Sequence, residues 1–97
     1  MRYEIIFSPD ARDHYHDLDA HYRAMIRDGI ETHLRHEPEK ISKSRIKRLE
    51  DVSQPQYRLR IGDYRVFYDV EEDRVHIFAI VPKSGADDWL RHYGVLQ

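Results

Sequence analysis

The stretch YRLRIGDYRVFYDV, residues 57–70, contains two runs of alternating residues separated by Gly62-Asp63. Aromatic and branched residues that alternate on either side of a two-residue Gly-Asp loop are typical of a β-hairpin. With this loop, Arg60 lies directly opposite Arg65, and opposed residues of a hairpin share one face of the sheet. The stretch therefore predicts a basic face and an apolar face, the latter formed by Tyr57, Leu59, Ile61, Tyr64, Val66 and Tyr68.

A second short loop, Glu72-Asp73, adds a third strand over residues 74–81. Continuing the same register pairs Phe67 with Phe78 and predicts that the basic face is open to solvent. The residues assigned to that face are Arg58, Arg60, Arg65, Phe67, Asp69, His76, Phe78 and Ile80.

Two interpretations of the basic face remain open. Arginines on exposed strands are common and discourage aggregation at sheet edges, so the face could simply be solvated. However, directly opposed arginines repel each other, and a bound phosphate offsets that repulsion through bidentate hydrogen bonds. Aromatic rings beside such cations also suit stacking by nucleic-acid bases. The second interpretation therefore predicts a site for phosphate and base.

The N-terminal part of the chain predicts one strand followed by two helices. Residues 3–7 alternate as a strand does. The sequence SPDA then suits a helix start, with Ser8 as the N-cap and a proline at the first helical position. Apolar residues continue at helical spacing, with a break near 17–19, where Asp19 is a candidate second cap. The helical region ends at Glu37-Pro38, because a residue before proline avoids the α-helical conformation.

Residues 38–52 are polar, basic and weakly patterned, and we expect a loop or a short extended segment there. A last helix is predicted between Ser84, as its cap, and Gly94. The element order is β-α-α-β-β-β-α. This order predicts an α+β fold, an antiparallel sheet with an N-terminal helical hairpin packed on one face and a short C-terminal helix.

Composition narrows the functional classes. The 97 residues contain no cysteine, so disulfides, thiolate metal sites and a cysteine nucleophile are excluded. No apolar run reaches the roughly 18 residues of a membrane span, and we expect a cytoplasmic protein without a membrane partner. The net charge is −2, but it is unevenly distributed. Residues 40–68 carry a net charge of +5 between two acidic ends, which favours one anion-attracting face.

Four motifs together carry a family resemblance. They are FSPDA at 7–11, KRLE at 47–50, the hairpin stretch at 57–70, and VHIFAIVPKS at 75–84. In this order they resemble the RelE/ParE toxin superfamily over nearly the whole chain, which implies a single toxin domain over residues 1–97. The resemblance also implies a type II toxin–antitoxin system with a cognate antitoxin protein as partner.

RelE-like members of this superfamily are ribosome-dependent endoribonucleases, or mRNA interferases, that inhibit translation by cutting mRNA. ParE-like members instead inhibit DNA gyrase. The arginine-rich hairpin favours the RelE-like activity, with ribosome and mRNA as partners. A ParE-like toxin, or a toxin fold that acts only by protein binding, is the alternative, and the acidic isoelectric point favours it because ribosome binding is normally driven by positive charge.

The resemblance implies specific site residues. Arg65 matches the family arginine that engages the scissile phosphate, and Arg58 and Arg60 match two basic positions on the preceding strand. Lys83 is the nearest match to a basic residue after the last strand, and Tyr93 or His92 to an aromatic or histidine near the C-terminus. Asp87 and Asp88 depart from the family pattern.

Cleavage by these residues needs neither metal nor cofactor. The ribose 2′-OH attacks the adjacent phosphate, cations stabilise the developing charge, and a proton carrier completes the step. His76 or His92 is the candidate proton carrier, with Asp69 orienting His76, although an ordinary strand histidine is the simpler interpretation. The residues expected to bind RNA around this centre are Lys47, Arg48, Phe67, His76 and Phe78.

Overall fold

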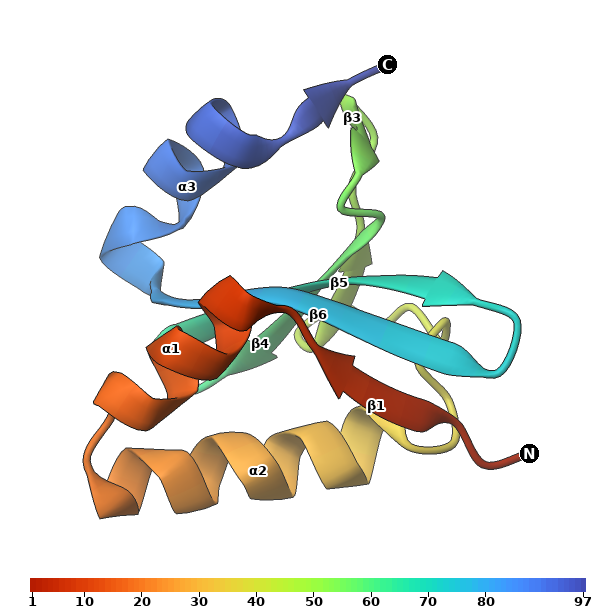
Figure 1. Cartoon of the computed structure of the whole chain (residues 1–97). Helices are drawn as coiled ribbons and strands as arrows, with labels where there is room; N and C mark the ends of the chain where they lie inside the picture. Colours follow the sequence, from red (N-terminus) through yellow and green to blue (C-terminus); the bar gives the residue numbers. More distant parts are fainter.

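The computed structural model describes residues 1–97 and contains a five-stranded sheet in the order β1-β6-β5-β4-β2. Helices lie on both sides of this sheet (Figure 1). The elements are β1 (Glu4–Phe7), α1 (Pro9–Asp17), α2 (Ala20–Leu34), β2 (Ile46–Arg48), β3 (Val52–Gln54), β4 (Tyr57–Ile61), β5 (Tyr64–Glu71), β6 (Arg74–Pro82), a 3₁₀ turn (Lys83–Gly85), α3 (Ala86–Tyr93) and β7 (Val95–Leu96). The predicted α+β class is confirmed.

Helices α1 and α2 pack on the apolar face of the sheet, as the sequence predicts. Ser8 caps α1 by accepting a hydrogen bond from the Ala11 amide at 3.0 Å, and Asp19 caps α2 by accepting from Tyr22 at 3.1 Å. None of the three helices is long and apolar enough to cross a membrane. The core between helices and sheet contains Ala11, Ile26, Ile30, Leu34, Ile46, Tyr57, Leu59, Ile61, Val66, Tyr68, Val75, Ile77 and Ile80.

Strand β1 occupies one edge of the sheet and pairs with β6 in parallel, with Ile5 opposite Val75. The sequence predicts antiparallel strands and gives no position for the first one. The parallel pair arises because β1 and β6 are far apart in the chain and meet through the helical crossover rather than through a hairpin. All other pairs in this sheet are antiparallel.

The β4–β5 hairpin has the predicted register, with Arg60 opposite Arg65 and Tyr57 opposite Tyr68. Gly62 adopts a φ of +55° in the loop, a conformation that favours glycine.

The next pairing departs from prediction, because β6 contains a bulge at Phe78. Phe67 therefore lies opposite Ala79 instead of Phe78, and Arg65 lies opposite Val81 instead of Ile80. Ile80 consequently belongs to the helix-covered core instead of the basic face.

The N-cap residue of α1 and one side chain within α1 satisfy the backbone at this bulge. The Ser8 hydroxyl donates to the Phe78 carbonyl at 3.1 Å. Nδ1 of His14 accepts a hydrogen bond from the Ile80 amide at 3.1 Å. Bulges leave backbone groups without a partner in the ladder, so these two bonds anchor α1 to the irregular part of β6.

Helix α3 covers the part of the second face around Phe67, which corrects the expectation of an open face there. Trp89 stacks on Phe67 with ring centroids 4.9 Å apart and an interplanar angle of 10°. Phe67 is fully buried as a result. Figure 1 shows α3 on the side of the sheet opposite to α2. The small core beneath it contains Phe67, Ala79, Val81 and Ala86, with Leu49, Trp89 and Leu90 against it.

The C-terminal strand β7 pairs with a strand that begins in the region predicted as a loop, residues 38–52. Residues 38–52 contain β2, which forms the second edge of the sheet, and the start of β3. Strand β3 pairs with β7 to form a separate two-stranded ribbon beyond α3 (Figure 1). Helix α3 begins after a 3₁₀ turn and not at a Ser84 cap, and it ends at Gly94 as predicted.

A candidate anion site between the sheet and α3

Basic side chains line two neighbouring cross-strand rows on the face covered by α3. Lys47 of β2 lies opposite Arg58 of β4, which in turn lies opposite Phe67 of β5. In the next row, Arg60 lies opposite Arg65. Because opposed residues project from the same face, β2 adds Lys47 to the three arginines that the hairpin brings together.

Arg65 is a buried cation, 8% exposed, that is held by the hairpin loop. Its Nη1 donates to the carbonyl of Gly62 at 3.0 Å and to the carbonyl of Tyr64 at 2.9 Å. Burial and the nearby Arg60 lower the pKa of Arg65, while Asp63 acts in the opposite direction. The guanidinium is therefore oriented by backbone carbonyls before any ligand arrives.

Arg58 is incompletely satisfied in the structure. Its Nε is buried and has no hydrogen-bond partner. Burial first, and then the charges of Arg65 and Arg60, lower the pKa of Arg58. A buried donor without an acceptor is costly, and an anion in front of it would supply the acceptor and offset the mutual repulsion of the arginines.

A cavity of about 290 Å³ opens beside these two arginines. Arg58, Arg65 and Phe67 contribute to it from the sheet, Lys83 from the 3₁₀ turn and Asp87 from the first turn of α3. Four cations and one carboxylate thus surround the space. The full lining is Lys47, Leu49, Arg58, Arg65, Phe67, Lys83, Ala86, Asp87 and Leu90.

The structure brings Lys83 to the arginines, as the resemblance implies, but separates the candidate proton carriers from them. His92 and Tyr93 are exposed in the last turn of α3 and do not line the cavity. Nδ1 of His92 instead lies 2.9 Å from the Asp88 carbonyl oxygen. Tyr93 stacks on Trp89 with centroids 5.5 Å apart, so it extends the aromatic stack outward.

His76 and Phe78 line a different pocket on the same side of the sheet. His76 lies opposite Asp69, as predicted, and its Nε2 is 4.0 Å from Glu71. The Asp69 carboxylate accepts from the Gln56 amide at 2.7 Å and so is already engaged away from His76. The two phenylalanine rings predicted to stack on bases are not available at the cavity. Phe67 lines the cavity but is buried under Trp89, and Phe78 lies in the second pocket.

Arg48 projects from the face of β2 opposite to the cavity. The prediction that it binds RNA together with Lys47 is therefore not supported by its position. Its guanidinium lies 5.0 Å from the centroid of the Tyr57 ring, on the side of the sheet that α2 covers. The register of β2 explains the difference, because neighbouring residues of a strand point to opposite faces. Lys47 therefore faces the cavity and Arg48 does not.

Asp87 and Trp89 belong to the site although sequence reasoning gave them no role there. Asp87 lines the cavity, and Trp89 places α3 over the buried Phe67 ring. The departure of Asp87 from the family pattern was the available signal. An aromatic residue near the end of the chain gave no indication of which strand it would cover.

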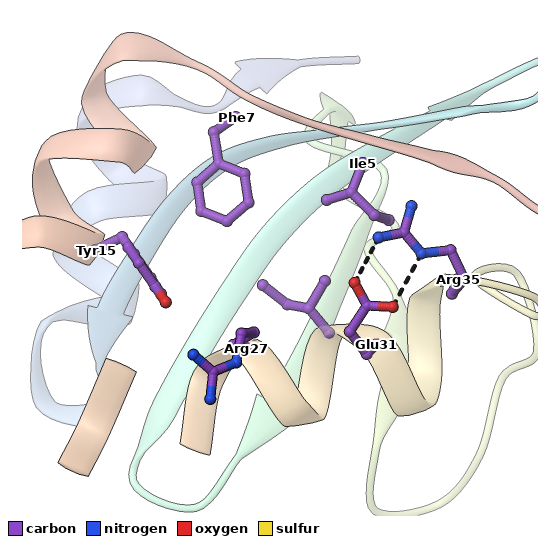
Figure 2. Close-up of a pocket in the computed structure, with 7 residues that line it drawn as sticks. Ile5, Phe7, Tyr15, Arg27, Glu31 and Arg35 are labelled. Carbon is purple, nitrogen blue, oxygen red and sulfur yellow. Dashed lines mark hydrogen bonds and ion pairs between the residues drawn. The ribbon is translucent and has the colours of Figure 1, made fainter. Parts of the chain in front are cut away.

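A second groove of about 290 Å³ lies on the other side of the sheet, between β1 and α2. Figure 2 shows that its walls are formed by Ile5, Phe7 and Tyr15, with Arg35 paired to Glu31 beneath Ile5. Nε of Arg35 donates to Glu31 Oε2 at 3.0 Å, and a second bond joins Nη2 to Oε1. Arg27 also lines this groove, and its Nε lies 3.7 Å from the Asp28 carboxylate. Each arginine of the groove therefore has a carboxylate partner, unlike Arg58 and Arg65 of the cavity under α3. No group of three or more histidine, aspartate or glutamate side chains is placed to hold a metal ion.

The sequence matches the family described as the ParE toxin of the type II toxin–antitoxin system parDE, over residues 5–86. The chain belongs to the ParE toxin family. It is thus a toxin of the RelE/ParE superfamily, as the four motifs predict. A comparison with curated proteins finds no match to the sequence.

Solved structures of toxins share the fold of this ParE family member. The RelBE2 toxin–antitoxin complex of Mycobacterium tuberculosis gives a TM-score of 0.72 at 23% identity, covering 84% of this chain and 99% of that chain. The RelE–RelB complex of Pyrococcus horikoshii OT3 gives a TM-score of 0.63 at 26% identity, covering 86% of this chain and 97% of that chain. The YoeB dimer of Staphylococcus aureus gives a TM-score of 0.57 at 22% identity, covering 81% of this chain and 94% of that chain.

Proposed function

We propose that this toxin is a ribosome-dependent endoribonuclease that binds an mRNA phosphate in the cavity under α3. The observation that carries the proposal is the state of Arg58, whose buried Nε lacks an acceptor while two further arginines crowd it. A phosphate diester provides both the missing acceptor and the opposite charge. The oriented Arg65 guanidinium supplies donors on the same side.

Cleavage at this site proceeds by attack of the ribose 2′-oxygen on the adjacent phosphorus. The P–O5′ bond breaks, which leaves a 2′,3′-cyclic phosphate and a 5′-hydroxyl. Arg58 and Arg65 stabilise the charge that develops on the phosphorane, with Lys47, Lys83 and the exposed Arg60 adding positive potential. Arginine stays protonated at neutral pH, so these arginines hold the phosphate and do not act as bases.

The proposal includes a cognate antitoxin as protein partner. The M. tuberculosis, P. horikoshii and Methanococcus jannaschii structures with this fold are toxin–antitoxin complexes. An antitoxin that neutralises this chain has to deny RNA access to the cavity, either by covering it or by moving α3. The proposed target, translated mRNA, places the activity in the cytoplasm.

Induced expression followed by mapping of 5′ ends in cellular mRNA tests the proposal. We expect new 5′ ends within translated codons for the wild type. Arg65→Ala should abolish them, whereas Arg12→Ala should not, because Arg12 is an exposed residue of α1 outside the cavity. Intact mRNA on induction of the wild type, or unchanged cleavage by a folded Arg65→Ala protein, would show that the assignment is wrong.

Gyrase inhibition is the second candidate function. The family match favours it, because the matched family is described as the ParE toxin of the parDE system and ParE-like toxins inhibit gyrase. The net charge of −2 also favours a protein target over the ribosome. The same induction experiment separates the two functions. DNA breaks linked to gyrase, with mRNA intact, would support the ParE-like function, and neither effect would support a toxin fold that acts by protein binding alone.

A further inference from the structure

The cavity under α3 contains a single side chain that can accept a proton at neutral pH. Its other ionisable lining residues are Lys47, Arg58, Arg65 and Lys83, all of which are donors. The histidines considered as proton carriers lie elsewhere, His76 in a separate pocket and His92 outside the cavity. We infer that Asp87 is the general base of the RNA cleavage reaction, an inference that rests on the proposed function.

Helix α3 fixes the place of Asp87 over the sheet. Asp87 is in the first turn of the helix, directly after the buried Ala86, and two residues before Trp89. The stack of Trp89 on Phe67, the cross-strand neighbour of Arg58, ties this turn to the strands that carry the arginines. The base and the phosphate-binding residues thus share one rigid support, which proton transfer requires.

Electrostatics permit a carboxylate beside the phosphate here. Four cations line the cavity with Asp87, so a phosphate diester enters a space that retains net positive charge. The neighbouring Asp88 differs in this respect. It pairs with Arg91 at 3.1 Å on the exposed side of α3 and does not line the cavity.

The Asp87 carboxylate takes the proton of the 2′-OH while the 2′-oxygen forms a bond to phosphorus. The P–O5′ bond breaks, and the leaving 5′-oxygen takes a proton from water. Asp87 then returns its proton to solvent, so that the enzyme is regenerated without metal, cofactor or oxidant.

The test compares Asp87→Asn with Asp88→Asn, two variants that remove the same charge from adjacent positions. Single-turnover cleavage is measured on an mRNA whose ribosome is stalled at a defined codon. We expect Asp87→Asn to lower the rate by at least roughly 100-fold, since general base catalysis contributes about 10²- to 10⁴-fold. Asp88→Asn should stay close to wild type, and Asp87→Glu should recover part of the lost rate.

Three further readouts, namely pH dependence, binding and folding, separate a base from a structural or repulsive role. The defect of Asp87→Asn should shrink as the pH is raised, because hydroxide replaces the missing base. Binding to the same mRNA with a 2′-deoxy nucleotide at the cleavage site, which cannot react, should be unchanged or tighter in Asp87→Asn. Its circular dichroism spectrum and melting temperature should match those of Asp88→Asn.

The outcomes distinguish this inference from the function on which it rests. If the wild type cleaves and Asp87→Asn cleaves within about threefold of Asp88→Asn, or faster, the base is another group and Asp87 only repels the substrate. A defect that is constant with pH, or that follows loss of binding, also overturns the inference. If the wild type leaves the mRNA intact on active ribosomes, the proposed nuclease function itself is wrong.

Discussion

Replacing Arg60 by glutamine should make the protein more stable while weakening its hold on anions. Arg60 lies opposite Arg65 and contributes to the lowered pKa of both Arg65 and Arg58. Its side chain is exposed and makes no hydrogen bond or ion pair in the structure. The substitution therefore removes repulsion without removing a contact.

The size of the effect follows from Coulomb's law. Two unit charges about 8 Å apart repel by about 0.5 kcal/mol at the dielectric constant of water and by about 2 kcal/mol at the value of about 20 found near a protein surface. Because Arg60 is exposed, we take the lower value for each of its two neighbours and expect the free energy of unfolding to rise by about 1 kcal/mol at low salt. For a domain of this size, that corresponds to a rise in melting temperature of about 4–8 °C. In 1 M salt the Debye length falls to about 3 Å, and the gain should disappear.

Urea unfolding and thermal melting of wild type, Arg60→Gln and Arg12→Gln provide the assay. Arg12→Gln changes the net charge equally from a position on α1, so it controls for the general effect of charge. Added inorganic phosphate should stabilise the wild type by RT ln(1 + [phosphate]/Kd), and it should stabilise Arg60→Gln less because the Kd is higher. A lower stability of Arg60→Gln than of Arg12→Gln at low salt, or a gain that persists in 1 M salt, would show that repulsion from Arg60 does not destabilise the fold.

Three further substitutions test the packing around the site. Trp89→Ala removes the aromatic stack, so it should lower the free energy of unfolding by roughly 2–3 kcal/mol and expose α3 to limited proteolysis. A variant that is as stable as the wild type and is not cleaved would contradict this. His14→Ala should cost about 1–3 kcal/mol in urea unfolding, since the Ile80 amide loses its acceptor, and a cost near zero would show that the bulge needs no anchor. The buried Tyr68 hydroxyl donates to the Pro38 carbonyl at 2.6 Å, and burial raises the pKa of Tyr68 far above its ordinary value. Wild-type stability should therefore fall above about pH 10 by about 1.4 kcal/mol per pH unit as the tyrosine ionises only in the unfolded chain, a decline that Tyr68→Phe should lack in urea titrations.

The part of the fold that follows from local pattern could be predicted from the sequence. The strict alternation of residues 57–70 around Gly62-Asp63 determines the register of the hairpin, and this register places Arg60 opposite Arg65 as observed. Proline and capping side chains likewise indicate where the first helices begin. Each of these signals lies within a few residues of the element it specifies.

The features that could not be predicted depend on contacts between distant residues. The bulge at Phe78 escapes detection because residues 77–81 are all apolar, so a shift of one position leaves the pattern unchanged. The burial of Phe67 depends on Trp89, and the orientation of Arg48 depends on the register of β2. For the same reason, the position of Asp87 became apparent only once α3 was placed over the sheet.

The parallel pairing of β1 with β6 has a consequence for the timing of synthesis. Glu4 pairs with Arg74, so the first strand has no partner until most of the chain has been polymerised. Helix α3, which completes the cavity, follows β6 in the chain and is made later still. At about 5–20 residues per second, several seconds separate the synthesis of β1 from that of α3. Throughout that interval the nascent chain lacks a finished cavity, so the anion site cannot form while β1 and the hairpin alone have been made.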